Sequence, residues 1–246
     1  MSSDMEAVFL DVGGTLRIVV PDEAFQAAAR LEFMQLVGAQ GPEDAFFGQL
    51  EGRWEEYRAQ SFSRLREASE TELWTRWLLP DFPAGKIGPL HGRLTRLWRD
   101  RDGRRVPRPD VKATVLELSR RGYRLGIIAN TITETEIPDW LDEDGLKDCF
   151  QAMVLSSIVG WRKPCTEIFL EACRRIGVEP ARCAYVGDNP ARDVPGARKA
   201  GFGTVLVLRD PGKPPKKPAG ADAAADRVIG SCGELLDIFP PRKGGA

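Results

Sequence analysis

The architecture of this chain follows most directly from the segment Val186-Gly187-Asp188-Asn189-Pro190-Ala191-Arg192-Asp193. Residues 184–186 form a short apolar run that predicts a buried strand, and residues 193–200 have the spacing of a helix. A short apolar strand followed by a helix is the repeating unit of a parallel sheet with both faces covered. Asp188 and Asp193 therefore stand where a predicted strand gives way to a predicted helix.

The same alternation extends along most of the remaining sequence. Further strands are predicted at residues 7–10, 123–129, 152–155, 204–208 and 227–229, and further helices at residues 110–121, 134–141, 165–176 and 231–239. Gly122 and Gly177 follow two of these helices as stop signals. We therefore predict an α/β protein, with a Rossmann-like parallel sheet as its core and helices on both faces.

The region after the first predicted strand lacks this alternation of strand and helix. Residues 22–100 show helical spacing, and Ser69-Glu70-Thr71-Glu72 fits a capping box at the start of one helix. No convincing strand is predicted in this region. We therefore predict that residues 17–106 form an inserted α-helical cap, or lid, on a core built from residues 1–16 and 107–246.

The composition excludes several classes of protein. A net charge of −1 gives no basic footprint for nucleic acid, and no apolar run reaches the ~20 residues that a membrane span needs. The acidic N-terminus does not fit a secretory signal, and the cysteines form no Cys-x-x-Cys pair. We therefore expect a cytoplasmic protein without nucleic-acid or membrane partners. The Pro- and Lys-rich residues 211–225 are interpreted as a surface excursion.

Polar side chains gather at the predicted strand ends. Ligands of open parallel sheets bind in the crevice beyond the carboxyl ends of the strands. The residues at or just after such ends are Asp11, Asn130, Thr131, Lys163 and Asp188. The predicted fold itself would therefore bring these side chains together.

These residue types favour phosphoryl chemistry. Asp11, Asp188 and Asp193 offer the hard oxygen ligands that Mg²⁺ prefers, and this ion usually shares its shell with a substrate phosphate. Lys163 would supply the positive charge that holds a phosphoryl group beside Asp11. A carboxylate flanked in this way can act as a nucleophile and form an acyl-phosphate, which water then hydrolyses.

The order of these motifs resembles that of the haloacid dehalogenase superfamily, in the subgroup with a helical cap inserted after the first motif. The resemblance covers nearly the whole chain. Its markers are Asp11-Val12-Gly13-Gly14-Thr15, Ile127-Ile128-Ala129-Asn130, Lys163-Pro164, and Gly187-Asp188 with Asp193. Together they are far more specific than any one motif alone.

The resemblance implies a role for each matching residue. Asp11 would be the catalytic nucleophile, and Lys163 would clamp both the nucleophile and the phosphate. The implied Mg²⁺ ligands are Asp11, Asp188, the backbone carbonyl of Gly13 and, through water, Asp193. The implied phosphate-binding residues are Thr15, Asn130, Thr131 and Lys163.

Two positions depart from the pattern of the superfamily's phosphatases. Gly13 stands where they usually carry a second aspartate, which protonates the leaving alcohol and later activates water. Such assistance is typically worth about 10²–10⁴-fold in rate. Ala129 stands where a hydroxyl normally contacts the phosphate, and that contact is worth about 0.5–1.5 kcal/mol. The first departure bears on turnover and the second on affinity.

Other functions fit parts of the pattern. The glycine at position 13 also favours the halide-displacing branch of the superfamily, but that chemistry needs no metal and makes no use of Asp188 and Asp193. A phosphonate-cleaving enzyme would need a lid lysine, for which Lys86 is the candidate. A sugar kinase would need a second phosphate loop, which this sequence does not show. A site with Gly13 and Ala129 could also bind metal and phosphate without efficient turnover, as a sensor or partner-binding module.

Side chains of the predicted cap receive structural interpretations. His91 is read as a packed or surface residue, and the tryptophans are read as lid core. The arginines near the hinge are interpreted as a solvated charge run, from which one side chain could reach a substrate anion; they are Arg99, Arg101, Arg104, Arg105 and Arg108.

The function predicted from these observations is Mg²⁺-dependent hydrolysis of a small phosphorylated metabolite through an aspartyl-phosphate. The lid would set the choice of substrate. The sequence makes no prediction about oligomeric state.

Overall fold

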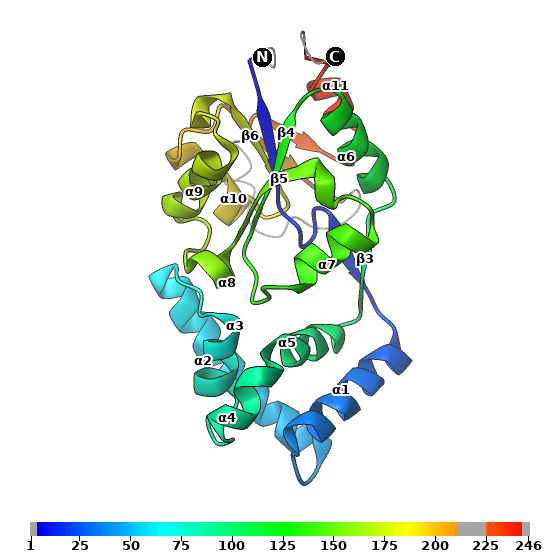
Figure 1. Ribbon diagram of the computed structural model, residues 1–246, viewed down its shortest axis with the longest axis vertical. Coiled ribbons are helices and arrows are strands. Elements are labelled where there is room, and N and C mark those ends of the chain that lie inside the picture. The colour runs from blue at the N-terminus through cyan, green and yellow to red at the C-terminus, as the bar shows by residue number, and fades with distance from the viewer. Residues whose placement is uncertain (1–3, 211–224, 243–246) are drawn as a thin grey trace.

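The computed structural model describes residues 4–210 and 225–242, and its core is a parallel sheet (Figure 1). The strands are β1 (Ala7–Leu10), β4 (Arg124–Ala129), β5 (Phe150–Leu155), β6 (Cys183–Gly187), β7 (Thr204–Leu208) and β8 (Arg227–Ile229). They lie in the order β5-β4-β1-β6-β7-β8, and each neighbouring pair in this sheet is parallel. The predicted α/β, Rossmann-like core is confirmed.

Each face of the sheet packs against its own helices, because successive side chains of a strand point to opposite faces. In β1, Val8 and Leu10 belong to one hydrophobic cluster, whereas Ala7 and Phe9 belong to the other. The first cluster includes residues of α6 (Val111–Arg120), α7 (Glu136–Glu143) and α11 (Leu235–Ile238). The second includes residues of α9 (Thr166–Ile176) and α10 (Pro190–Lys199). Figure 1 shows these two sets of helices on opposite sides of the strands.

The strand order determines where polar side chains meet. β1 lies between β4 on one side and β6 on the other, so the chain changes direction across the sheet at β1. A ligand binds outside the carboxyl ends of the strands at such a point. Asp11, Asn130 and Asp188 directly follow these strands.

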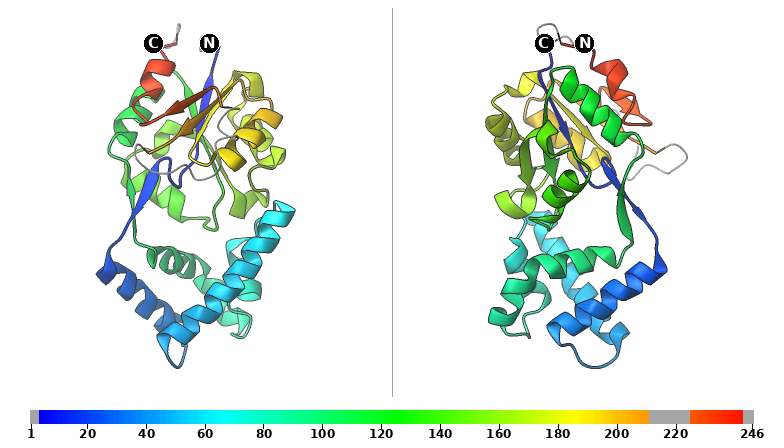
Figure 2. Two further views of the ribbon diagram at one scale, coloured as in Figure 1. Left: turned by 180° about the vertical axis from the view of Figure 1, so that it is seen from behind. Right: turned by 45° about the vertical axis from the view of Figure 1, so that its right-hand side comes forward.

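Residues 23–100 form a group of helices beyond the carboxyl edge of the sheet (Figures 1 and 2). The helices are α1 (Glu23–Val37), α2 (Glu43–Arg64), α3 (Glu70–Glu72), a π-helical turn (Leu73–Leu78), α4 (Ala84–Ile87), a 3₁₀ turn (Gly88–Leu90) and α5 (His91–Asp100). They surround a hydrophobic cluster of their own, in which Phe33 contacts both Trp74 and Trp98. The tryptophans form a core, as predicted: Trp74 and Trp98 lie in this cluster, and Trp54 and Trp77 pack against it.

Local capping explains where these helices start and stop. The Asp22 side chain accepts a hydrogen bond from the Phe25 backbone N–H at 3.0 Å, and α1 ends at Gly38, whose φ of 75° is left-handed. The Ser69 hydroxyl accepts from the Glu72 backbone N–H at 3.2 Å, as the capping box predicts.

A two-stranded ribbon links the helices to the sheet, and it was not predicted. β2 (Arg17–Val20) and β3 (Arg104–Pro107) pair antiparallel at the two ends of the helical group. Each strand has four residues, and Val19 and Val20 are 47% and 42% exposed, so no buried apolar run marks the ribbon. The predicted limits of the cap, residues 17 and 106, both fall within it.

Helix α10 begins at Pro190 rather than at Asp193, because proline is favoured in the first turn, where its missing N–H is not needed. The predicted surface excursion at residues 211–225 lies outside the described residues except for Ala225. Within the described ranges, no helix has both the length and the apolar character required to cross a membrane.

Candidate active site

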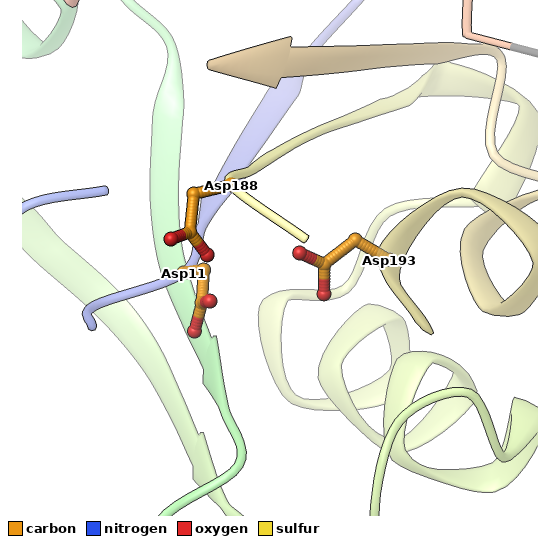
Figure 3. A group of neighbouring side chains, drawn as sticks. All are labelled: Asp11, Asp188 and Asp193. Carbon is orange, nitrogen blue, oxygen red and sulfur yellow. The ribbon is translucent and has the colours of Figure 1, made fainter. Parts of the chain in front are cut away.

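The predicted acidic residues meet at the carboxyl edge of the sheet. Carboxylate oxygens of Asp11, Asp188 and Asp193 all lie within 4.8 Å of one another. Figure 3 shows Asp11 and Asp188 extending from adjacent strand ends, with Asp193 facing them from helix α10. All three residues are buried. The structure therefore brings together the side chains that the sequence placed at separate strand ends.

Gly187 permits the close approach of Asp193. A Cβ atom at position 187 would lie 2.3 Å from Asp193 Oδ2, so a larger residue would displace this carboxylate. The same oxygen accepts a hydrogen bond from the Asn189 backbone N–H at 3.0 Å. This bond ties Asp193 to the loop that carries Asp188.

Lys163 is a buried cation that bridges the acidic residues. Its Nζ lies 3.1 Å from Asp11 Oδ1 and 3.0 Å from Asp193 Oδ1. It also donates a hydrogen bond to the Ile128 carbonyl at 3.0 Å and contacts the Tyr185 hydroxyl. The predicted proximity of Lys163 to Asp11 is thus observed.

The predicted phosphate-binding residues have other contacts in this structure. Asn130 accepts from the Lys163 backbone N–H at 2.8 Å and donates to the Lys163 carbonyl at 3.0 Å, so it positions the lysine loop. The Thr131 hydroxyl accepts from the Thr133 backbone N–H at 3.2 Å. Thr15 is fully buried. Their contacts with phosphate stay predictions.

Electrostatics favour the ionised form of Asp11. Burial raises the pKa of this carboxyl, but the positive charges of Lys163 and Arg192 outweigh that effect and hold the pKa below its ordinary value. Burial and the nearby Asp193 carboxylate raise the pKa of Tyr185 well above its ordinary value, so its hydroxyl stays protonated. Asp11 is therefore charged at neutral pH, as a nucleophile or metal ligand must be.

Arg192 is a site residue that the sequence analysis did not single out. Its Nη2 lies 2.9 Å from Asp11 Oδ2 and 3.7 Å from Asp188 Oδ1, and its Nε lies 3.5 Å from Asp193 Oδ1. Burial lowers the pKa of the guanidinium, but Asp11 and Asp193 raise it above its ordinary value. The available signal was its place between Asp188 and Asp193, in the first turn of α10.

The donor set fits a divalent cation. Carboxylates of Asp11, Asp188 and Asp193 are hard oxygen ligands of the kind that Mg²⁺ binds, and they are close enough to share one ion. Lys163 and Arg192 supply two positive charges against the three carboxylates, which leaves one negative charge in the cluster. Further positive charge is therefore favoured here.

Removing the Arg192 charge is expected to strengthen Mg²⁺ binding. The guanidinium competes for all three carboxylates, so an Arg192→Gln variant should lower the Mg²⁺ dissociation constant about tenfold, equivalent to about 1.4 kcal/mol. Isothermal titration of Mg²⁺ into protein without substrate measures this constant. Arg198→Gln, on the same helix but paired with Asp226, is the control and should leave it unchanged. Unchanged or weaker Mg²⁺ binding by Arg192→Gln would contradict the competition.

A cavity of about 580 Å³ opens beside the acidic cluster, with Gly13 and Asp188 in its wall. Arg99, Arg105 and Arg108 also line it, so the interpretation of these residues as a solvated charge run is wrong. The side chain of Arg105 is only 12% exposed. These arginines lie in or next to α5 and β3, and their spacing in the sequence does not reveal that they line one cavity.

Ion pairs and backbone contacts tie the helical group to the sheet beside Lys163. Glu67, after α2, forms a buried ion pair with Arg162 and accepts from the Ser156 hydroxyl at 3.0 Å. Glu70 and Glu134 exchange reciprocal bonds, each backbone N–H donating to the other's carboxylate, at 2.9 and 3.2 Å. His91 Nδ1 lies 3.3 Å from the Glu70 carboxylate, which supports its interpretation as a structural residue.

Comparison with known proteins agrees with this geometry. A family described as haloacid dehalogenase-like hydrolase matches residues 5–201. Phosphoserine phosphatase of Thermus thermophilus is 30% identical, over 96% of this chain and 98% of that protein. Glyceraldehyde 3-phosphate phosphatase of Methanopyrus kandleri is 36% identical over 54% of this chain and 56% of its own length, so the chain spans about half of that relative.

The fold is shared with enzymes of more than one activity. This chain is similar in structure to a 2-haloacid dehalogenase from Pseudomonas syringae. The match covers 95% of this chain and 97% of the dehalogenase chain, with a TM-score of 0.68 and 21% identity. At that identity the likeness concerns the fold, and a fold hosts several functions. The choice of reaction therefore rests on the side chains of the site.

Proposed function

The chain belongs to the haloacid dehalogenase-like hydrolase family, and from that premise we propose that it is a Mg²⁺-dependent phosphatase of a small phosphorylated metabolite. One observation carries the proposal: Asp11, an ionised carboxylate, touches Lys163 and lies beside Asp188 and Asp193. The names of two relatives, a phosphoserine phosphatase and a glyceraldehyde 3-phosphate phosphatase, support it.

In this proposal Asp11 attacks the phosphorus atom of the substrate. The bond from phosphorus to the leaving oxygen breaks, and an aspartyl-phosphate forms on Asp11. Water then attacks that phosphorus, which releases inorganic phosphate and regenerates the carboxylate. Lys163 holds Asp11 in its charged form and offsets negative charge on the phosphoryl group.

The implied metal site uses the same residues. Asp11, Asp188 and the Gly13 carbonyl would hold Mg²⁺ directly, and Asp193 would hold it through water. When bound, the ion would neutralise charge on the transferring phosphoryl group. Thr15, Asn130 and Thr131 complete the proposed phosphate contacts.

Gly13 limits the range of efficient substrates. Without an acid at this position, no side chain of the first motif protonates the leaving oxygen. Acyl and aryl phosphates release a carboxylate or a phenolate, which is a stable anion, so their leaving oxygen needs little protonation. We therefore expect faster turnover of these compounds than of alkyl phosphates.

The helices of residues 23–100 are proposed to act as the lid. The buried Glu67–Arg162 pair joins them to the residue before Lys163, so movement of the lid would shift the position of Lys163. Exclusion of water by such a lid strengthens electrostatic interactions and protects the acyl-phosphate.

A dehalogenase is the second candidate. Gly13 favours it, because the halide-displacing branch of the family also lacks the second aspartate. The cluster of Asp188 and Asp193 with Asp11 favours the phosphatase, because halide displacement by a carboxylate does not require a metal site.

The two candidates give opposite results in one experiment. Phosphate release is measured with p-nitrophenyl phosphate, acetyl phosphate and sugar phosphates in Mg²⁺ and in chelator, and halide release is measured with 2-haloacids. The proposed phosphatase releases phosphate in Mg²⁺ and loses this activity in chelator. Halide release that persists in chelator would identify a dehalogenase. Binding of Mg²⁺ and phosphate without turnover of either set would identify a binding module.

A further inference from the structure

Arginines dominate the charged side chains that line the cavity beside Asp188. The cavity wall carries Arg17, Arg99, Arg105, Arg108 and Arg209, against the carboxylates of Asp188 and Asp210. Asp188 belongs to the acidic cluster, and Asp210 forms an ion pair with Arg108. The cavity is therefore acidic where it meets the proposed metal site and basic elsewhere.

Some of these arginines are anchored by carboxylates outside the cavity lining. Arg17 lies 2.6 Å from Asp144 and stacks 4.7 Å from the centre of the Trp140 ring. Arg99 Nε lies 2.5 Å from the buried Glu136 carboxylate. Such pairs fix the guanidinium groups in place, so their remaining N–H groups are preorganised for a ligand.

The carboxylate partner of Arg105 is weaker than those of Arg17, Arg99 and Arg108. Its Nη2 is 3.4 Å from Asp102, a side chain that is 54% exposed and therefore screened by water. Its Nη1 instead donates to the Arg99 carbonyl. Burial, together with the neighbouring charge of Arg99, lowers the pKa of Arg105 to about 10. Positive charge is thus concentrated at this end of the cavity, and an anion placed there would offset it.

We propose that Arg105, together with Arg99, binds a second anionic group of the substrate, either a carboxylate or a second phosphate. The inference rests on the proposed function and narrows it: the substrate is a phosphorylated acid or a bisphosphate, rather than the phosphate ester of a neutral alcohol. The phosphate to be cleaved lies at the Asp188 end, and the second anion lies at the arginine end.

The rest of the cavity suits such a molecule. Its volume of about 580 Å³ lies in the range of about 300–1,000 Å³ that is typical of small-molecule sites. Ile18, Val19 and Trp140 contribute apolar surface to its wall. A short carbon skeleton can therefore join the two anionic groups.

Binding to a form without turnover tests the proposal. The Asp11→Asn variant is titrated in Mg²⁺ with 3-phosphoglycerate and with glycerol 3-phosphate, which differ in a carboxylate. A second pair, fructose 1,6-bisphosphate and fructose 6-phosphate, separates a second phosphate from a carboxylate. We expect at least one pair to show about a tenfold or larger preference for the partner with two anionic groups, because charge-assisted hydrogen bonds to a guanidinium are strong.

Variants of Arg105 and of its neighbour Arg104 show whether Arg105 causes this binding preference. Adding Arg105→Gln should reduce the ratio to about one, and Arg105→Lys, which keeps the charge, should retain part of it. Arg104→Gln is the matched control, since Arg104 is 54% exposed, pairs with Asp22 and lies on the same strand. Equal affinity within both pairs, or a preference that Arg105→Gln leaves intact, would overturn the proposal.

The same ligands separate this inference from the proposed function. If the wild-type protein hydrolyses both members of each pair with equal kcat/KM, the second anion site is wrong and the phosphatase stands. If the compounds with two anionic groups bind preferentially through Arg105 but acetyl phosphate and p-nitrophenyl phosphate are not hydrolysed in Mg²⁺, the anion site stands and the phosphatase is wrong.

Discussion

An Asp11→Asn variant is expected to lose phosphatase activity by about 10⁴-fold or more, the scale seen when an enzyme loses its attacking group. An amide nitrogen or oxygen cannot replace the carboxylate as a nucleophile towards phosphorus. Steady-state release of phosphate from p-nitrophenyl phosphate in Mg²⁺ measures the loss.

The fold of this variant should survive. Asparagine has the shape of aspartate, and its neutrality removes the excess negative charge that Asp11, Asp188 and Asp193 hold against Lys163 and Arg192. We therefore expect a melting temperature close to that of the wild type. Asp226→Asn, which loses an aspartate–arginine pair outside the cluster and the cavity, is the control and should keep most of the activity. Retention of more than about a tenth of wild-type activity by Asp11→Asn would exclude Asp11 as the nucleophile, since the expected loss is far larger.

A Gly13→Asp variant is expected to gain activity towards alkyl phosphates by about 10²–10⁴-fold, the usual contribution of general acid–base catalysis. The position can accept a side chain: a Cβ atom at Gly13 would meet no described atom within 4 Å, and the residue lines the cavity beside Asp188. The new carboxyl would protonate the leaving oxygen and then activate water. Comparison of kcat for glycerol 3-phosphate before and after the substitution measures the gain.

The gain should depend on the acid and on the leaving group. Gly13→Asn has nearly the same shape but transfers no proton, so it should stay near the wild-type rate. With p-nitrophenyl phosphate, whose leaving group needs little protonation, Gly13→Asp should change kcat/KM, which reports formation of the aspartyl-phosphate, much less. Equal effects of aspartate and asparagine on the alkyl phosphate would show that position 13 does not reach the leaving oxygen.

Much of the fold was predictable because its signals are local. The apolar run of β1 and the capping residue Ser69 each determine structure within a few residues. The meeting of Asp11 with Asp188 and Asp193 was predictable for a related reason: in a parallel sheet, the carboxyl ends of adjacent strands share one edge.

The rest depends on contacts between distant parts of the chain. Arg105 looks like one of several hinge arginines until β3 pairs with β2 and places its side chain in the cavity. Asn130 follows a strand end as predicted, but whether its amide faces phosphate or the Lys163 backbone depends on a loop about thirty residues away. Arg192 lies within the most informative segment, yet an arginine in the first turn of a helix ordinarily faces water.

The most direct test of the proposed mechanism is whether a phosphoryl group becomes attached to Asp11. Without an acid–base residue at position 13, hydrolysis of the aspartyl-phosphate should be slow, so this intermediate should accumulate. Wild-type protein is mixed with acetyl phosphate and Mg²⁺, quenched in acid within the first turnovers and analysed by peptide mass spectrometry. The mechanism predicts one added phosphoryl group on the peptide that contains Asp11 and none in Asp11→Asn. Steady release of phosphate from protein whose Asp11 stays unmodified, or a phosphoryl group that persists in Asp11→Asn, would contradict it.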